Sequence, residues 1–394
     1  MEYQYAAPCH FGLESVLSGE LKRMGAQNVA AIDGRVSFTG DFSILARANL
    51  NLRTAERVLL CLGEFEARSF TELFDQVRQL PFEEFIGKHD AFPVKGHSVH
   101  SQLHSVPDCQ SIIKKAAVER LKEKYGLGWF EETGPVHQIQ FTILKDKVSI
   151  YLDTSGAGLH KRGYRKNGNE APIKETLAAG ILDLMRVRRD SVFYDPFCGS
   201  GTFLIEAALK GMNIPAGINR NFAAQRWDCI PAKIWAEERT RGLDLVRRDA
   251  KFAAYGSDID PKAVDLTLFN ANKAGIAPRV RIRTRSIREF RTVTDEGIVV
   301  TNPPYGERLL DVEEARKIYR DMGKAFERRD GFTYAIISPD EKFEQYFGRR
   351  ASKRRKLYNG MLKCNLYCYV PRPGGRAAKT TRPHGPTPTA ETAR

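Results

Sequence analysis

The chain has 394 residues, of which 42% are hydrophobic and 28% charged, as expected for a folded protein of two or three domains. It has no apolar run long enough to span a membrane, and its first residues lack the basic start and apolar core of a secretory signal, so a cytoplasmic location is expected. Lys and Arg number 62 and Asp and Glu 48, a net charge of +14 that suggests a polyanionic partner such as nucleic acid, although a charge that serves only solubility is the alternative.

Residues 1 to about 165 alternate short strand-like runs with amphipathic segments. Apolar residues at helical spacing predict a helix at 111–121. Strands are predicted at 34–38, 57–62, 138–144 and 147–152, the last two joined by the polar turn Lys145-Asp146. This half is therefore predicted to be α+β.

From about residue 170 to 370, strand and helix patterns alternate as in a parallel sheet with crossover helices. Strands are predicted at 192–194, 252–256, 280–283, 297–300 and 333–337, and helices at 172–186, 202–211, 261–274 and 312–328. The last residues, 371–394, contain five prolines, five Lys or Arg and one acid, and are predicted to form a disordered basic tail.

The first chemical motif is the run Asp195-Pro196-Phe197-Cys198-Gly199-Ser200-Gly201-Thr202, between a predicted strand and a predicted helix. Glycines let the backbone turn sharply and approach a ligand, and the free N–H groups of the helix start suit a carboxylate or phosphate. A tight structural turn explains a single Gly-x-Gly equally well. A dinucleotide site is disfavoured, because Leu204 replaces the third glycine and the next strand-ending acid, Asp258, comes much later than the motif requires.

Two aspartates follow the second predicted strand of this half. Asp258 ends the strand, where a carboxylate can accept both hydroxyls of a ribose; a turn-forming aspartate is the alternative. Asp260 precedes Pro261 and is predicted to cap the next helix.

The most informative motif is Asn302-Pro303-Pro304-Tyr305-Gly306, which follows the predicted strand at 297–300. The two prolines fix the backbone and remove two N–H groups, so the Asn302 amide oxygen and the carbonyls are presented as acceptors. Tyr305 offers a flat face for a base. Two acceptors can take the hydrogens of a planar amine and direct its lone pair at an electrophilic methyl group. A rigid turn with a packed tyrosine is the alternative.

The order of these three motifs resembles that of class I S-adenosylmethionine (SAM)-dependent amino-methyltransferases. The stretches 159–165, 171–179 and 302–309 resemble the catalytic domain of the THUMP-containing guanine-N2 RNA methyltransferase family, and above all the bacterial 23S rRNA enzymes with a single methyltransferase domain. Phe11-Gly12-Leu13-Glu14 and the pattern up to residue 155 resemble a ferredoxin-like segment followed by a THUMP domain. The resemblance covers roughly residues 1–370.

The resemblance implies an α/β Rossmann-like methyltransferase domain preceded by an α+β RNA-binding region. The implied boundaries are a ferredoxin-like segment at 1–64, a THUMP domain at 65–158, the methyltransferase domain at 159–370 and the basic tail at 371–394. The implied cofactor is SAM, and the implied partner is RNA. The implied reaction is methylation of a guanine N2 amine in RNA, with 23S rRNA as the expected substrate.

The resemblance also assigns roles to residues of the three motifs. The glycine loop would hold the methionine part of SAM, Asp258 its ribose, and Asn302 and Pro303 the target amine, while Tyr305 would stack on a flipped base. The expected cofactor-binding set is Asp195, Phe197, Cys198, Gly199, Ser200, Gly201, Thr202, Asp258, Ile259 and Asn302, and the expected catalytic set is Asn302, Pro303, Pro304 and Tyr305. Ser286 stands where many relatives carry an acid near the adenine, so the adenine contacts are not assigned.

Several weaker patterns leave alternatives open. His97, His100 and His104 precede Cys109, but their serine-rich surroundings favour a strand and loop, and no metal site is expected. The cations at 349–356 form either a solvated loop or a phosphate contact. Those at 160–165 belong either to a linker or to an RNA contact. Segment 212–250 is either an RNA-contacting insertion or a helical cover. The seven cysteines form no CxxC pair; Cys364 and Cys368 are expected to share the core face of a strand.

Other functions share some of these motifs. A tRNA guanine-N2 methyltransferase would share all of them, and DNA adenine-N6 and protein glutamine methyltransferases also use Asn-Pro-Pro-Tyr. The N-terminal pattern of an RNA-binding region argues against the last two. A non-catalytic RNA-binding factor is a further alternative, against which the intact Asn302 and glycine loop argue.

Overall fold

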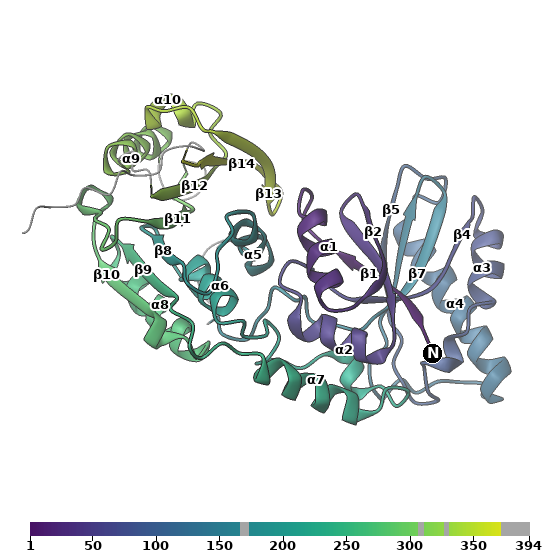
Figure 1. Ribbon diagram of the computed structural model, residues 1–394. Coiled ribbons are helices and arrows are strands. Elements are labelled where there is room, and N and C mark those ends of the chain that lie inside the picture. Colours follow the sequence, from purple (N-terminus) through teal and green to yellow (C-terminus); the bar gives the residue numbers. More distant parts are fainter. Residues whose placement is uncertain (166–172, 306–310, 327–330, 372–394) are drawn as a thin grey trace, which may run out of the picture.

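The computed structural model describes residues 1–165, 173–305, 311–326 and 331–371. The chain forms two halves, each built on a seven-stranded sheet, that lie side by side (Figure 1). We refer to residues 1–165 as the N-terminal half and to residues 173–371 as the C-terminal half. The predicted tail lies outside the described residues except for Pro371.

The N-terminal sheet has the strand order β2-β3-β1-β4-β7-β6-β5, and only β5 and β6 pair in parallel. Its strands are β1 (Tyr3–Pro8), β2 (Gln27–Ile32), β3 (Arg35–Gly40), β4 (Leu59–Glu66), β5 (Val94–Val99), β6 (Ile139–Leu144) and β7 (Lys147–Asp153). Its helices are α1 (Glu14–Arg23), α2 (Phe42–Asn51), α3 (Phe70–Arg78) and α4 (Val106–Tyr125). The elements predicted for this half are confirmed. Because β4 pairs with both β1 and β7, one sheet runs through the whole half.

This sheet buries mainly one face. Along β7, Val148, Ile150 and Leu152 belong to the core that the helices cover, whereas Tyr151 packs on the other face with only a few neighbours. Alternation of this kind is typical of an antiparallel sheet with helices on one side. The predicted α+β class is therefore confirmed.

The C-terminal sheet has the order β10-β9-β8-β11-β12-β14-β13, with parallel pairing from β10 to β12 and antiparallel pairing at β14. Its strands are β8 (Val192–Asp195), β9 (Ala253–Asp258), β10 (Val280–Thr284), β11 (Gly297–Thr301), β12 (Phe332–Ser338), β13 (Lys353–Asn359) and β14 (Leu362–Tyr369). Its helices are α5 (Glu175–Leu184), α6 (Thr202–Gly211), α7 (Ala232–Asp244), α8 (Pro261–Lys273), α9 (Val312–Ala325) and α10 (Phe343–Phe347). All the predicted elements are present, although the predicted start of the first helix, Pro172, and the predicted end of the last helix, residues 327 and 328, lie outside the described residues.

Both faces of the C-terminal sheet are buried. In β8, Phe193 joins the core under α5, α6 and α8, whereas Tyr194 joins the core under α9 and α10. A parallel sheet covered by helices on both faces is the doubly wound architecture predicted from the sequence. Cys364 and Cys368 lie buried in the first of these cores, as expected.

Only the first part of the basic run at 349–356, up to Ser352, lies in a loop, so the solvated-loop alternative holds for Arg350 but not for the rest of the run. Residues from Lys353 onward form β13, the edge strand of the C-terminal sheet. Leu357 is the residue that anchors it, because its side chain is buried opposite Cys364 of β14. A strand at a sheet edge commonly carries exposed Lys and Arg, which discourage pairing with another chain.

Segment 212–250 forms a helical cover, as one of the two alternatives for it expects, and an RNA contact on its outer face stays a prediction. Figure 1 shows α7 lying against α2 of the N-terminal half. Trp227 and Trp235 are both buried in the N-terminal core, and Trp227 stacks on His137 with ring centroids 4.4 Å apart. A segment of the C-terminal half thus completes the core of the other half.

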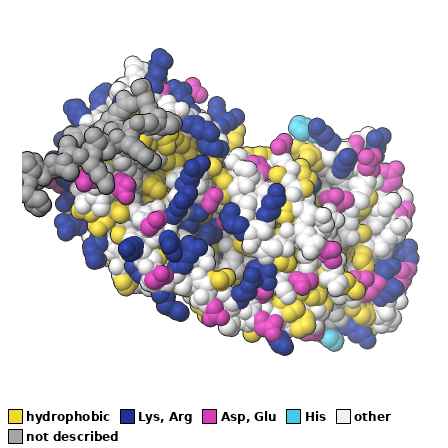
Figure 2. All heavy atoms as spheres, in the orientation of Figure 1, with side chains coloured by type: hydrophobic (Ala, Val, Ile, Leu, Met, Phe, Trp, Pro, Cys, Tyr) yellow, Lys and Arg dark blue, Asp and Glu magenta, His cyan; other side chains and the backbone are white. Residues whose placement is uncertain are grey.

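Potential metal ligands and long apolar helices were sought throughout the part of the chain that the structure describes. Within the described ranges, no group of three or more metal-binding side chains gathers, and His100 and His104 are exposed in the loop after β5. No described helix combines the length and the apolar character that crossing a membrane requires. Figure 2 shows Lys and Arg side chains over much of the C-terminal half.

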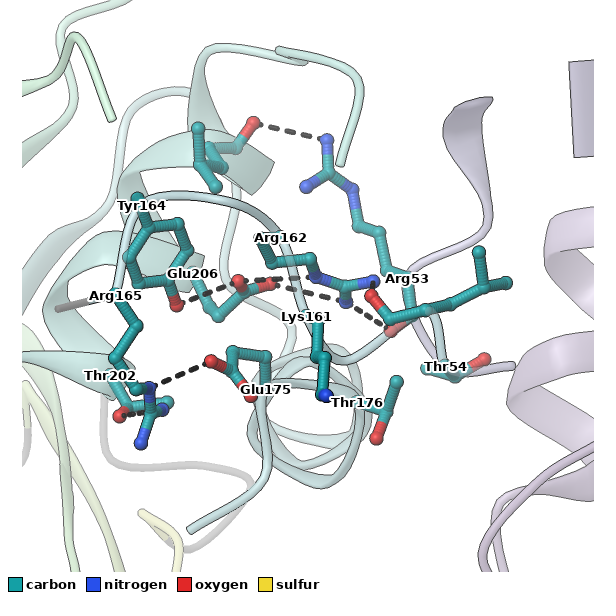
Figure 3. Close-up of polar contacts among 12 residues, drawn as sticks. Arg53, Thr54, Lys161, Arg162, Tyr164, Arg165, Glu175, Thr176, Thr202 and Glu206 are labelled. Carbon is teal, nitrogen blue, oxygen red and sulfur yellow. Dashed lines mark hydrogen bonds and ion pairs between the residues drawn. The ribbon is translucent and has the colours of Figure 1, made fainter. Parts of the chain in front are cut away.

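A buried charge network joins the two halves (Figure 3). The Glu206 carboxylate of α6 is fully buried, lies 3.4 Å from Nε of Arg162 and accepts a hydrogen bond of 3.1 Å from the Tyr164 hydroxyl. Arg162 also donates to the backbone carbonyl of Arg53, at 2.5 Å. Arg162 is therefore part of a structural linker, whereas Lys161 is exposed and an RNA contact there stays a prediction.

A second anchor lies beside the first. Glu56 of the N-terminal half accepts a hydrogen bond from Thr176 of α5 and lies 3.2 Å from the ammonium of Lys174. Burial acts to raise the pKa of Glu56, but hydrogen bonds from His10, His160 and Thr176 outweigh it and hold that pKa below its ordinary value.

We expect Arg162→Ala to lower the free energy of unfolding by about 3–5 kcal/mol, because it removes the guanidinium that donates to the buried Glu206 carboxylate. Urea denaturation would measure the loss. As a control, Lys122→Ala removes one partner of an exposed pair with Glu119 and should cost less than about 1 kcal/mol. The double variant Arg162→Met, Glu206→Leu should recover part of the loss, and equal costs for Arg162→Ala and Lys122→Ala would contradict the role given to the network.

Candidate cofactor and substrate site

The three sequence motifs meet at one edge of the C-terminal sheet. The glycine loop follows β8, Asp258 ends β9 and Asn302 follows β11, and these three strands are neighbours. After β8, the chain adds β9 and β10 on one side of β8, and then adds β11 and β12 on its other side. Ligands of such sheets bind outside the carboxyl ends of the strands, where the order reverses. In this sheet the order reverses between β8 and β11.

Two glycines allow the loop after β8 to enter α6. Gly199 and Gly201 have positive φ angles of 51° and 81°. A Cβ on Gly201 would lie 2.6 Å from the Thr267 side chain, whereas a Cβ on Gly199 would meet no atom within 4 Å. The Gly201 position is therefore closely packed, and the loop is open at Gly199. The start of α6 has no side-chain cap among the described residues, so its N–H groups can receive an anionic group.

Two side chains of α8 fix the glycine loop from behind, and the sequence analysis missed both. Thr267 donates to the Gly199 carbonyl at 2.7 Å, and Asn270 donates to the Ser200 carbonyl at 2.9 Å. Both side chains are fully buried. The available signal was two polar residues three positions apart on the apolar face of the predicted helix, where a polar group needs a buried partner.

Asp258 organises the same loop. One carboxylate oxygen accepts the Gly199 N–H at 2.9 Å, and the other accepts the Asp260 N–H at 3.1 Å. Asp260 in turn caps α8 by accepting the Lys262 N–H, as predicted. The turn-forming role considered for Asp258 is therefore present, and its carboxylate oxygens still have lone pairs for a ligand. The neighbouring Ile259 is 75% exposed at the rim of the site.

Asp195 connects β8 to β11. Its Oδ1 accepts hydrogen bonds from the Thr301 hydroxyl at 2.7 Å and from the Phe197 N–H at 3.2 Å. Burial raises the pKa of the Asp195 carboxyl to about 7, despite the hydrogen bond from Thr301, and the nearby Asp258 adds to the increase. Asp195 is thus a buried group that sets the spacing of the two strands at the switch point.

The amide oxygen of Asn302, Oδ1, is a buried hydrogen-bond acceptor that receives no hydrogen bond from the described residues, although buried polar atoms in proteins are normally paired. Pro303 and Pro304 follow directly and supply no N–H groups that could compete for it. The Tyr305 hydroxyl accepts a hydrogen bond of 3.1 Å from the Asn359 amide, at the end of β13. Gly306 to Leu309 lie outside the described residues.

The remaining predicted residues of the loop contribute in different ways. Cys198 is buried, burial raises the pKa of its thiol well above the usual value, and its N–H donates to the Ser257 carbonyl. Phe197 is half-buried, and the Ser200 and Thr202 hydroxyls lie 3.4 Å apart. Cys198 therefore supplies backbone to the loop, and its side chain is a core residue and not a nucleophile.

Arg165 reaches the start of α6 from the linker. It donates to the Thr202 hydroxyl at 2.9 Å and forms an ion pair with Glu175 of α5, also at 2.9 Å (Figure 3). This contact was not predicted and brings a cation next to the glycine loop.

Ser286 has a structural role in the position where many relatives carry an acid. Its hydroxyl accepts the N–H of Arg288 at 3.4 Å and begins a short 3₁₀ turn after β10. A serine in this position can cap a turn as an aspartate does, but it offers no negative charge to a ligand.

The residues at the switch point fit the cofactor SAM. The loop is open where a Cβ on Gly199 would point, the α6 start offers N–H groups to a carboxylate, and Asp258 offers acceptors for ribose hydroxyls. The unpaired Asn302 Oδ1 supplies an acceptor for an amine on the β11 side.

Comparison with known proteins agrees with this geometry. Three family descriptions match in succession: an RlmL ferredoxin-like domain at residues 4–59, a THUMP domain at 67–153 and an RMKL-like methyltransferase domain at 162–368. The protein named "Putative RNA methyltransferase YpsC" from Bacillus subtilis (strain 168) is 41% identical over 370 residues, which cover 93% of this chain and 96% of that protein.

A second relative and a solved structure extend the comparison. The "Ribosomal RNA large subunit methyltransferase K/L" of Psychromonas ingrahamii is 31% identical over 93% of this chain, and this chain spans only 50% of that relative's length. The structure described as "SMU.472, a putative methyltransferase complexed with SAH" has a TM-score of 0.89 and 38% identity over 94% of this chain and 99% of that one.

The buried Asp195 predicts a pH dependence of stability. Its folded pKa of about 7 lies above the ordinary 3.8, so the folded protein loses stability as the pH rises through this window and is fully stabilised below it. Between about pH 5 and about pH 8 the loss should be about 2–3 kcal/mol. Asp195→Asn keeps the acceptor for Thr301 and removes the ionisation. Urea denaturation at the two pH values should therefore show the wild type losing stability relative to Asp195→Asn, and parallel pH profiles would refute the assignment.

Proposed function

Because this chain belongs to the RMKL-like methyltransferase family and is therefore a SAM-dependent RNA methyltransferase, we propose that it methylates the exocyclic N2 amine of a guanine in 23S rRNA. The observation that carries the proposal is the buried, unpaired Asn302 Oδ1 at the switch point, across from the glycine loop. The N-terminal ferredoxin-like and THUMP domains supply the RNA-binding region. The relative named for ribosomal RNA supports 23S rRNA as the substrate.

The cofactor occupies the β8 side of the site in this proposal. The N–H groups at the start of α6 receive the carboxylate of its methionine part, and Asp258 accepts the ribose hydroxyls. When bound, SAM supplies an electrophilic methyl group. Thr267 and Asn270 hold the loop carbonyls, so the loop does not need to reorganise when the cofactor binds.

The amine is held on the β11 side. Asn302 Oδ1 accepts one amine hydrogen, and a backbone carbonyl of the proline pair accepts the other. With both hydrogens engaged, the nitrogen lone pair leaves conjugation with the ring and points at the methyl group. The nitrogen–methyl bond forms as the sulfur–methyl bond breaks, and the amine proton leaves afterwards, so positioning contributes more than a strong base.

Tyr305 holds the base in the plane that this geometry requires. Its ring provides a stacking surface for a base taken out of a helix, and Asn359 fixes the ring orientation through the hydroxyl. In this proposal the Tyr305 ring orients the base by stacking, and the two acceptors orient its amine by hydrogen bonding.

The direct test is methyl transfer from labelled SAM to purified 23S rRNA, total tRNA and duplex DNA, followed by nucleoside analysis. We expect N2-methylguanosine in 23S rRNA only. Asn302→Ala should reduce the rate by at least about a hundredfold, because a donor on the transferring amine is left unpaired, while SAM affinity should change little.

Each other outcome has a defined meaning. Label in tRNA would move the substrate to tRNA and keep the guanine chemistry. Methyladenine in DNA would overturn the guanine proposal. RNA binding without transfer, unchanged by Asn302→Ala, would support a non-catalytic factor.

Two variants of Tyr305 separate stacking from hydrogen bonding. Tyr305→Ala removes the ring and should lower kcat/KM for RNA by roughly 5- to 150-fold, the range expected for loss of one base–aromatic stack. Tyr305→Phe keeps the ring, loses the hydroxyl that accepts from Asn359 and should stay within a few-fold of the wild type. Steady-state kinetics on the methylated RNA would measure both, and equal losses would show that stacking is not the role of Tyr305.

A further inference from the structure

The hairpin formed by β13 and β14 extends past the edge of the sheet where the site lies. Ser338, at the carboxyl end of β12, pairs with Asn365 of β14, so the hairpin continues beyond the end of β12. Its last pair is Asn359 with Leu362, which leaves Gly360 and Met361 as the loop. Because Asn359 donates to the Tyr305 hydroxyl, the tip of the hairpin lies next to the proposed base-stacking residue.

The conformation of the hairpin is defined by its turn and by the packing of β13 on the N-terminal half. Gly360 has a positive φ of 64°, as the first loop position of a type II′ turn requires. Leu357 is buried in a core that also contains Leu13 of the N-terminal half. A Cβ on Gly12 would lie 3.7 Å from the Lys356 carbonyl, so the N-terminal half contacts β13 directly. The tip therefore has a fixed position relative to both halves.

The tip carries an apolar side chain that packs on nothing. Met361 has a relative exposure of 102%. Single exposed apolar residues are common on protein surfaces and need no function. The position of Met361 sets it apart. It lies in the two-residue loop that directly follows the pair Asn359–Leu362, and Asn359 is the hydrogen-bond partner of Tyr305.

Cations line the strand that leads to the tip. The side chains of Lys353 and Lys356 on β13 are exposed, and Arg355 between them is half-exposed. Figure 2 shows further Lys and Arg on this half of the molecule. An edge strand with this composition can follow an RNA phosphate backbone and bring the apolar tip to the bases.

We propose that the β13–β14 hairpin is an RNA-opening wedge, in which Met361 inserts into the base stack that the target guanine leaves. The inference rests on the proposed function, because only a base inside a helix needs to be extracted. Methionine is one of the apolar side chains that proteins insert between base steps, and filling the gap offsets a cost of a few kcal/mol for unstacking. The β13 cations hold the backbone while Tyr305 receives the base.

The test uses a synthetic RNA stem-loop that carries the target guanine, mapped by mass spectrometry of ribonuclease fragments of the methylated RNA. It has 2-aminopurine beside this guanine, and an unpaired strand of the same sequence is the comparison. The variants are Met361→Ser, Met361→Leu and, as a control, Ile32→Ser. Ile32 is 50% exposed and lies at the end of β2, before another hairpin turn. The 2-aminopurine fluorescence, measured with S-adenosylhomocysteine so that no turnover occurs, reports unstacking of the target.

We expect Met361→Ser to lower the ratio of methylation rates on stem-loop and unpaired RNA about tenfold and to abolish most of the fluorescence increase on the stem-loop. Met361→Leu and Ile32→Ser should behave as the wild type. If Met361→Ser gives the same fluorescence increase on the stem-loop as the wild type, the wedge is overturned. This readout does not depend on how well the unpaired strand is methylated. An equal rate loss on both RNAs would also overturn it and leave the proposed function intact. Absence of N2-methylguanosine with the wild type would overturn the function and the wedge together.

Discussion

The buried carboxylate of Glu206 is the constraint on which the arrangement of the two halves depends. A charge removed from water is tolerated only where its partners are fixed, and here they are Arg162 and Tyr164 of the linker. Arg162 also bonds the Arg53 carbonyl of the N-terminal half. Because Glu206 belongs to α6, which follows the glycine loop, one helix carries both the proposed cofactor-binding end and the attachment to the N-terminal half.

Two further contacts keep the halves in one relative position. Trp227, before α7, and Trp235, within α7, lie in the N-terminal core, and Leu13, directly before α1, lies in the C-terminal core. Each half therefore completes the other with apolar side chains, and separation would expose both cores. RNA captured by the N-terminal half would meet a site whose position is already fixed, which reduces the cost of orienting the base.

The electrostatics of the site follow from where its two aspartates are placed. Asp258 lies at the loop surface and accepts two backbone N–H groups, whereas Asp195 is buried and burial raises its pKa to about 7. The site thus combines one acceptor available to the cofactor with one carboxyl that is partly neutral near pH 7. Its field is less negative than two ionised carboxylates would produce, which favours the approach of a polyanionic substrate.

Much of the fold and the order of the site motifs could be read from the sequence, because local pattern determines them. Strand and helix periodicity gave the α+β and the doubly wound halves, and the glycine loop, Asp258 and the Asn302 motif each follow a strand whose end is predictable. Parallel strands place such ends at one edge, so their meeting could be expected, and the family resemblance supplied the cofactor and the substrate class.

Only the tertiary structure showed which distant residues support that edge. Thr267 and Asn270 are polar residues on the apolar face of a predicted helix, but the sequence does not show that their partners are carbonyls of the glycine loop. Glu206 has the pattern of an ordinary surface position of a helix. The cations of the run ending at Lys356 conceal the strand that Leu357 anchors. The partners of a buried polar group lie far away along the chain, and no local periodicity encodes them. For that reason the sequence by itself determined the elements and the motifs, and the fold decided how they are held together.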